Sequence, residues 1–232
     1  MSTRVNLGRV PAIGVGLVVV MLLVSAYGAV VIPNDAPVAI HWGVNGQADG
    51  YVAKWPALLL LPATGIVLLG IFLLVPRVEP RQEHLARSAP AYRATTLAPL
   101  ALIAVLQVLV VAYAVGVRFD MAAAVSAGVG VVFIVIGNYV GKTQSMFLFG
   151  VRTPWTLSSE RAWALTNRLT GRLLVLLGIA IEVVILLGAR GTVLVSVLLG
   201  GVALVAVGST VYSYLVWRAD PTRSQREEGN PR

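Results

Sequence analysis

Within its apolar segments the chain has few side chains suited to proton transfer or ligand binding. Glu182 is a carboxylate inside the sequence GIAIEVVIL, and Gln107 is an amide near the middle of another apolar segment. A carboxylate in such a position is costly unless it is protonated or has a polar partner. Two interpretations stay open: a buried hydrogen bond, which Gln107 is placed to donate, or a proton or ligand site.

His41 and Asp49 form a second candidate group, and the chemistry they suggest is metal binding. Zinc sites use three or four protein ligands, so two side chains without a third are weak evidence. We favour a histidine that hydrogen-bonds within its own loop, and we predict no metal site and no cofactor. The other histidine, His84, falls on the opposite side of the membrane in the topology that the charges predict.

The segment GNYVGKT, residues 137–143, resembles a phosphate-binding loop. The Walker pattern has four residues between its glycines, whereas only three separate Gly137 from Gly141, and this segment ends an apolar helix instead of beginning one. We interpret the two glycines as small residues that allow close helix packing. The chain has no cysteine, no paired carboxylates and no Ser/His/Asp set, so we predict that it is not an enzyme.

The elements that must position these residues are membrane spans. The chain is 57% hydrophobic and 12% charged, with a mean hydropathy of +0.83, whereas soluble domains are roughly 45–50% apolar and 25% charged. Six apolar runs approach or exceed the ~20 residues that cross a bilayer, so we predict an all-α integral membrane protein with six transmembrane helices. Short connections predict tight hairpins between the third and fourth runs and between the fifth and sixth. The runs are residues 10–32, 56–75, 94–117, 121–141, 171–189 and 192–217.

Basic residues are distributed unequally between the two sides of these spans. Lys54, Arg118 and Arg190 fall in the loops on one side, and the other 15 of the 18 Lys and Arg residues share the side of the N-terminus. The positive-inside rule therefore predicts that both termini are cytoplasmic. The same rule accounts for the net charge of +8, and we predict no direct binding of nucleic acid. The 15 are Arg4, Arg9, Arg77, Arg81, Arg87, Arg93, Lys142, Arg152, Arg161, Arg168, Arg172, Arg218, Arg223, Arg226 and Arg232.

The outer loop, residues 33–55, has more content than a plain connector needs. Residues 38–42 suit a short extended stretch, and Asn45-Gly46 and Asp49-Gly50 are turn signals because these residue types tolerate positive φ. Aromatic rings here suit the headgroup level of a membrane. We predict a small turn-rich extracytoplasmic cap that serves as a contact surface for an external partner. The candidate residues are His41, Trp42, Asn45, Asp49 and Tyr51.

The inner loop, residues 142–170, is equally distinctive. Pro154 disfavours helix at Thr153, and Ser158 is a suitable N-cap for a helix from Ser159. We predict a short interfacial cytoplasmic helix before the fifth span, with Trp155 and Trp163 at the interface. Helical spacing would place Trp163, Thr166, Asn167 and Thr170 on one face and Arg161, Arg168 and Arg172 on a flank that reaches anionic headgroups.

The segment NYVGKTQSMFLFGVRTPWTLSSERAWALTNRLTGR, residues 138–172, resembles the signature of the SdpI family of bacterial membrane immunity proteins. The outer-loop sequence IPNDAPVAIHWGVNGQADGY is similar to the region that often accompanies it. Met146 and Asn167 depart from the pattern, which usually has Asn and His at these positions. The matching residues are Asn138, Tyr139, Lys142, Gly150, Arg152, Thr153, Trp155, Thr156, Leu157, Trp163, Thr166 and Arg168.

This resemblance implies a protein of the bacterial cell membrane, in contact with lipids, that protects the cell from a secreted antimicrobial peptide toxin. In the best-known member it also implies signalling, in which the toxin-occupied protein sequesters a cytoplasmic repressor. The alternative function is a small proton-coupled transporter that uses Glu182, and a membrane enzyme ranks last. We divide the chain into a two-helix region at residues 1–93, a four-helix SdpI-like region at residues 94–217 and a polar tail at residues 218–232.

The charge distribution can be tested with topology reporters. A reporter fused after Arg232 should report the cytoplasm and one inserted near Gly46 the outside, because basic segments are retained in the cytoplasm. Paired alkaline phosphatase and green fluorescent protein fusions measure this. A cytoplasmic signal from the insertion near Gly46 would overturn the orientation.

Overall fold

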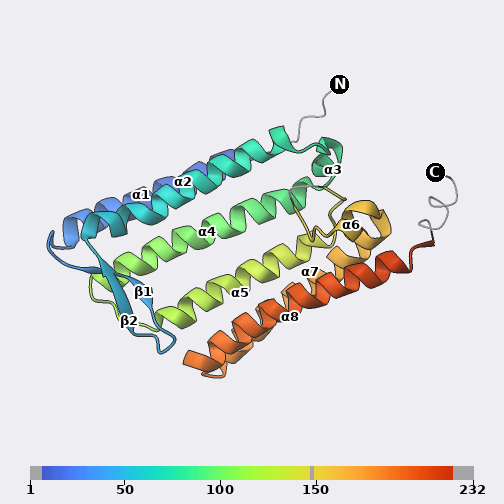
Figure 1. The fold of residues 1–232 in the computed structure, drawn as a ribbon. Helices are drawn as coiled ribbons and strands as arrows, with labels where there is room; N and C mark the ends of the chain where they lie inside the picture. The colour runs from blue at the N-terminus through green and yellow to red at the C-terminus, as the bar shows by residue number, and fades with distance from the viewer. Residues whose placement is uncertain (1–6, 147–148, 222–232) are drawn as a thin grey trace.

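The computed structural model describes residues 7–146 and 149–221, so Arg4, Arg223, Arg226 and Arg232 of the predicted cytoplasmic set lie outside the described residues. The described part folds as a bundle of long helices with one small β-hairpin at one end (Figure 1). The elements are α1 (Val10–Val31), β1 (Val38–Trp42), β2 (Ala48–Val52), α2 (Lys54–Val78), α3 (Gln82–Arg87), α4 (Ala89–Ala114), α5 (Met121–Val140), α6 (Pro154–Ser158), α7 (Glu160–Leu186) and α8 (Gly191–Arg218).

Six of these helices are long and apolar enough to cross a membrane, which confirms the six predicted spans: α1, α2, α4, α5, α7 and α8. Helices suit this setting because each backbone N–H and C=O inside lipid must find a partner within the protein. Large apolar side chains on their outer faces stay exposed; Val30 and Leu186 are both 84% exposed. Helices α4 and α5 form one antiparallel hairpin and α7 and α8 another, as the short connections predict (Figure 1).

Polar side chains join the first half of the bundle at depth. The Gln107 side chain on α4 donates from Nε2 to Ser25 Oγ at 2.9 Å, and the same nitrogen lies 3.3 Å from the Leu58 carbonyl of α2. Ser25 Oγ in turn donates to the Leu58 carbonyl at 2.7 Å. The hydrogen bond considered between Gln107 and Glu182 is therefore absent, because Gln107 faces α1 and α2, whereas Glu182 faces α5.

Glycines bring α5 and α7 into backbone contact in the second half of the bundle. A Cβ added to Gly137 would lie 2.6 Å from the Gly171 carbonyl oxygen, and one added to Gly171 would lie 2.6 Å from the Gly137 oxygen. Seven residues away, Gly178 meets the Gly130 oxygen in the same way at 2.5 Å. Gly141 packs on the backbone of Arg168, where an added Cβ would lie 3.0 Å from Cα. The predicted packing role of Gly137 and Gly141 is confirmed, and it resembles the small-residue interfaces of membrane helices.

The three basic residues of the outer loops all hold the C-terminal ends of helices. Lys54 is buried, and its Nζ donates to the Ala29 and Ile32 carbonyl oxygens at the end of α1, both 2.6 Å away. Arg118 donates to the Tyr113 carbonyl at the end of α4 at 2.7 Å. Such ends have unpaired carbonyls and a negative partial charge, which basic side chains stabilise.

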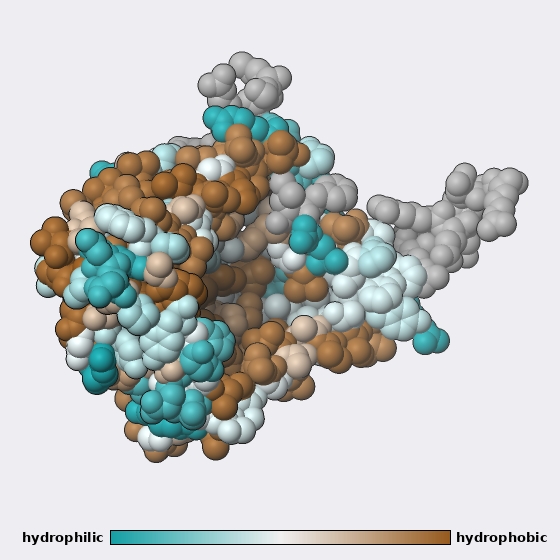
Figure 2. Space-filling view, turned by 60° about the vertical axis from the view of Figure 1, so that its left-hand side comes forward, coloured by the Kyte–Doolittle hydropathy of each residue, from teal (hydrophilic) through white to brown (hydrophobic). Residues whose placement is uncertain are grey.

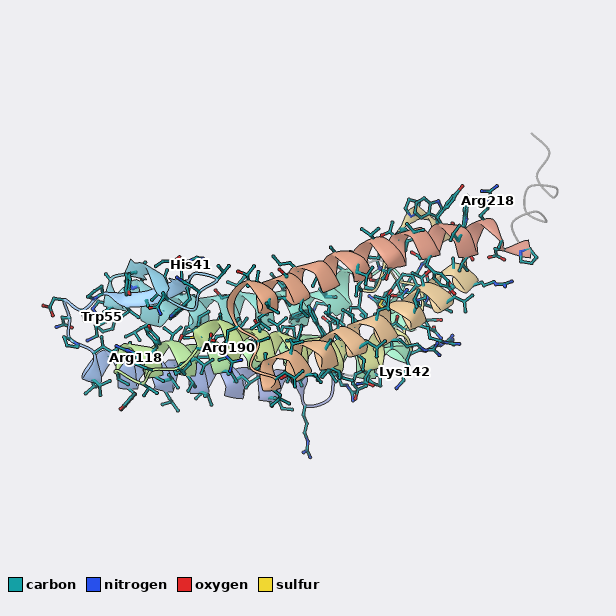
Figure 3. The ribbon with its side chains drawn as sticks, turned by 90° about the horizontal axis from the view of Figure 1, so that it is seen from below. His41, Trp55, Arg118, Lys142, Arg190 and Arg218 are labelled. Carbon is teal, nitrogen blue, oxygen red and sulfur yellow. The ribbon has the colours of Figure 1, made fainter. Side chains whose placement is uncertain are left out.

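Arg190 plays the same part at the end of α7 and also links two hairpins. It donates to the Ile185 carbonyl in the last turn of α7 at 3.1 Å and to the adjacent Ala189 carbonyl at 2.7 Å, and its Nε lies 3.0 Å from Asp120 Oδ2. Asp120 is the N-cap of α5, where its other oxygen accepts from the Ala123 N–H at 2.9 Å. Figure 3 shows Arg118 and Arg190 toward the end that holds His41 and Trp55, and Lys142 and Arg218 toward the other.

Lys54 offers a test of this capping. We expect Lys54→Met to lower the free energy of unfolding by about 2 kcal/mol, because the buried carbonyls of α1 lose their donor. Thermal unfolding of the purified protein in detergent measures the loss. Arg118→Met removes an exposed capping residue and is the matched control, with a smaller expected effect. Equal stability of Lys54→Met and the parent would contradict the capping role.

Candidate functional site

The outer hairpin is formed by β1 and β2, which pair antiparallel with Val38 opposite Val52 and His41 opposite Gly50. Gly46 has φ +76°, so the predicted Asn45-Gly46 turn is confirmed. The predicted turn at Asp49-Gly50 is wrong, because both residues lie within β2. Pairing is irregular on both sides of His41, and a Cβ added to Gly50 would lie 2.8 Å from His41 Cβ. Glycine at position 50 therefore allows β1 and β2 to approach each other closely.

Polar side chains of the hairpin bond to one another. His41 Nδ1 lies 2.5 Å from Asp49 Oδ1, which confirms the hydrogen bond favoured over a metal pair. Asn45 Oδ1 accepts from the Gln47 N–H at 3.1 Å and tightens the turn, and Tyr51 stays exposed. Within residues 7–146 and 149–221 the structure has no group of three His, Asp or Glu side chains arranged to hold a metal ion.

A pocket of about 360 Å³ lies beneath the hairpin. The Trp42 indole forms part of its wall and packs edge-to-face on Tyr113, with the ring centroids 5.4 Å apart. Trp42 Nε1 is buried and has no hydrogen-bond partner in the described part of the chain. Figure 2 shows a hollow with mainly hydrophobic walls beside the hydrophilic residues at this end. The lining includes Ile40 and His41 of β1, Leu61 of α2, Leu106 of α4, and Val125 and Ser126 of α5.

The inner loop is docked around Trp163. This side chain is 1% exposed, and its Nε1 donates to the Thr143 carbonyl at 2.9 Å. The prediction of an interfacial Trp163 is wrong, because the loop folds over the ring and encloses it within the protein. Gly150 has φ +104°, and a Cβ added there would lie 2.8 Å from the ring. Asn167 Oδ1 accepts from the Val151 N–H at 2.8 Å and fixes the next residue of the loop.

The short helix α6 ties the loop to α8. Thr153 is extended, as Pro154 predicts, and forms a capping box with Thr156. Thr153 Oγ1 lies 3.1 Å from Ser213 Oγ on α8, and Trp155 packs edge-to-face on Tyr214 with centroids 5.2 Å apart. The loop therefore has fixed contacts on both α7 and α8.

Helix α7 begins one residue later than predicted, because Ser158 ends α6 and Ser159 is the N-cap of α7. Ser159 Oγ accepts from the Ala162 N–H at 3.0 Å. The predicted short helix and the fifth span form one continuous helix, Glu160–Leu186. The predicted faces are present: Trp163, Thr166, Asn167 and Thr170 are buried, and Arg161, Arg168 and Arg172 are exposed.

A contact with α3 was not predicted from the sequence. His84 Nδ1 lies 2.5 Å from the Ser145 carbonyl oxygen, and Arg81 hydrogen-bonds the Ser145 hydroxyl. The Gln144 N–H donates to Ser88 Oγ at 3.0 Å, at the junction of α3 and α4. Helix α3 has only six residues. A helix of this length is too short for its sequence pattern to indicate contact with a loop some sixty residues away.

The signature residues thus fall into two groups. One group belongs to the docked loop, and the other lines an open pocket on the surface of α5 and α7. Gly150, Thr153, Trp155, Thr156, Trp163 and Thr166 belong to the loop and its contacts, and Arg152 is exposed beside them. Tyr139 lies in the last turn of α5, with its ring centroid 5.6 Å from Lys142 Nζ. The remaining matching polar residues, Asn138, Lys142 and Arg168, line a pocket on the outside of α5 and α7.

Glu182 is isolated from these groups. One carboxyl oxygen is buried against Gly130, where an added Cβ would lie 2.5 Å from Oε1, and that oxygen has no hydrogen-bond partner within the described residues. Neither Gln107 nor a basic side chain pairs with it among the hydrogen bonds and ion pairs of that part of the chain. The carboxyl group therefore makes a packing contact between α7 and α5 at Gly130.

Gly150 tests whether the loop must dock on Trp163. We expect Gly150→Ala to loosen the loop, because alanine disfavours positive φ and its Cβ would meet the ring. Limited proteolysis of inside-out membrane vesicles should show faster cleavage near residue 150. Gly200→Ala, in open space on α8, is the control and should cleave like the parent. Unchanged cleavage of Gly150→Ala would refute the docking.

Comparisons with known proteins match two separate parts of the chain. Residues 142–213 match the SdpI/YfhL protein family, and residues 16–66 match a Domain of unknown function (DUF1648). The chain is 28% identical over 183 residues to Immunity protein SdpI of Bacillus subtilis (strain 168), a similarity that covers 79% of this chain and 84% of that protein. No solved structure matches the chain. These findings confirm the resemblance seen in the signature: the chain is a multi-pass bacterial membrane protein whose residues 142–213 match the SdpI/YfhL protein family.

Proposed function

We propose that this protein is an immunity protein that protects its bacterium from a secreted antimicrobial peptide. The observation that carries the proposal is the similarity to Immunity protein SdpI along 79% of the chain. That similarity runs over 183 residues, so it includes much more of the helical bundle than the short signature. The relative is an immunity protein, and we accordingly propose a binding function without catalysis.

The pocket beneath the hairpin is the proposed place of peptide binding. Its walls are mainly apolar, which suits the apolar face of an amphipathic peptide. His41 adds a polar group to the lining, and its ring is hydrogen-bonded to Asp49. The Trp42 side chain lines the pocket, and its N–H has no hydrogen-bond partner within the described residues. A carbonyl group of a bound peptide would accept a hydrogen bond from this N–H. A peptide held there would be kept from the lipid that it attacks.

The proposed orientation places this pocket outside the cell and both termini in the cytoplasm. The three basic residues of the hairpin end are engaged in capping helix ends, which gives each a structural reason to lie on the side that is poor in positive charge. The opposite end has the remaining basic residues that the structure describes. A secreted peptide would therefore meet the hairpin first.

Signalling through a cytoplasmic repressor is a further part of the proposal. A polar pocket of about 480 Å³ lies at the opposite end of the bundle, between α6, the start of α7 and the end of α8. Arg81, Glu160 and Arg161 give it both signs of charge, which suits the charged surface of a protein partner. Its floor includes Asp220, which the Ser159 hydroxyl binds.

Variants of the hairpin test the function and the place of binding together. In a peptide-sensitive strain, the parent protein should allow growth in the presence of the secreted peptide. Trp42→Ala with Asp49→Ala should reduce protection about tenfold or more, while membrane expression stays near that of the parent, because both residues belong to the small hairpin and not to a membrane span. Val44→Ala, on the exposed turn outside the pocket, is the control. Full protection by the double variant would move the peptide site elsewhere.

Glu182→Gln separates immunity by binding from proton-coupled transport. The amide keeps the shape and polarity of the carboxyl but cannot ionise. We expect this variant to express and protect like the parent, because its carboxyl makes a packing contact on Gly130. Growth assays with immunoblots of membrane fractions measure both quantities. Loss of protection at normal expression would favour the transporter instead.

A further inference from the structure

The pocket between the exposed faces of α5 and α7 has a composition that the proposed peptide binding does not use. It measures about 700 Å³, and its lining includes three basic side chains and no acidic one: Lys142, Arg168 and Arg172. Asn138 adds a polar amide. Arg168 and Arg172 have no hydrogen-bond or ion-pair partner within the described residues, and Lys142 Nζ is held 5.6 Å from the Tyr139 ring centroid.

The floor of this pocket is backbone, because glycines face each other there. Gly137, Gly141 and Gly171 all line it, and any Cβ at these positions would collide with the partner helix. The close approach of the helices brings Lys142, just beyond the end of α5, beside Arg168 on α7. Convergence of the basic groups is thus a consequence of the glycine contact.

One face of α7 changes from basic to apolar residues along the helix, from its beginning toward its middle. Arg168, Arg172 and Leu176 are spaced by four residues, so they lie on the same face, one turn apart. Val175 and Leu176 complete the pocket toward the middle of the span, and Leu176 is 62% exposed. The pocket is basic at the helix end near the membrane surface and apolar toward the membrane interior.

We propose that this pocket binds an anionic phospholipid, with the headgroup phosphate between Lys142, Arg168 and Arg172 and an acyl chain along Val175 and Leu176. Guanidinium groups bind phosphate through two parallel N–H donors, and an ammonium adds a point charge. Basic pockets between membrane helices on the cytoplasmic side suit such headgroups. The apolar end of the pocket selects a lipid over a free phosphate.

Binding can be measured with the purified full chain in neutral detergent. Native mass spectrometry during titration with phosphatidylglycerol and with phosphatidylcholine of the same chain length gives the preference of the protein. We expect the parent to bind phosphatidylglycerol about tenfold more tightly. The variant Lys142→Gln/Arg168→Gln/Arg172→Gln should lose this preference.

A matched control removes the same charge from the same end of the bundle. Arg9→Gln/Arg87→Gln/Arg218→Gln changes three exposed residues outside the pocket and should keep the preference. If the pocket variant does not elute as a folded protein, Arg172→Gln alone is measured, with an expected loss of about fivefold.

Three outcomes would overturn the proposal. Equal loss in the control would indicate a general attraction of basic residues for anionic lipid. Displacement of the lipid by millimolar inorganic phosphate would indicate a site for a soluble anion. Equal binding of the two lipids by the parent protein would show that the pocket does not select anionic lipid. None of these results depends on protection from a peptide, so immunity and lipid binding can fail separately.

Discussion

Backbone contact between α5 and α7 is the interaction on which the end of the bundle with the signature loop depends. Gly137 and Gly171 each meet the other's carbonyl oxygen, and Gly130 and Gly178 repeat the arrangement seven residues away. Two contacts fix both the separation and the relative rotation of the helices. Trp163 and Asn167 on α7 are thereby set against the chain that leaves α5, so the loop can close over them. The same contact brings Lys142 beside Arg168, which makes the basic pocket another product of the glycine contact.

Hydrogen bonding of the non-helical backbone explains the remaining polar residues of the signature. Chain segments at the ends of membrane spans have few options, because unpaired backbone groups near lipid are costly. At the end that holds the signature loop, side chains of Asn167, Thr156 and Trp163 bond to loop backbone. At the hairpin end, Lys54 and Arg190 bond to helix carbonyls. At the hairpin end the donors are basic side chains, whereas at the loop end neutral side chains act together with Arg81 and His84.

Features with a local cause could be predicted from the sequence. The six spans follow from apolar length, the Asn45-Gly46 turn from residue type, and the buried face of α7 from helical spacing. Features that depend on distant partners could not. Lys54 resembles an ordinary loop lysine in the sequence, and only the fold brings it to the end of α1. Trp163 resembles an interfacial tryptophan until the loop covers it, and Gln107 finds Ser25 instead of Glu182 because α4 faces α1.

A disulfide cross-link tests most directly whether the signature loop is docked as a fixed part of the bundle. The chain has no cysteine, so a designed pair forms without competition. Thr153→Cys with Ser213→Cys joins positions whose hydroxyl oxygens are 3.1 Å apart. Thr153→Cys with Val211→Cys is the control, because Val211 is exposed and lies two residues from Ser213, on the opposite side of α8. In oxidised membranes, the docked loop predicts rapid, nearly complete cross-linking of the first pair and little of the second. Equal, slow cross-linking of both pairs would show a loop that samples many positions, and would contradict the account.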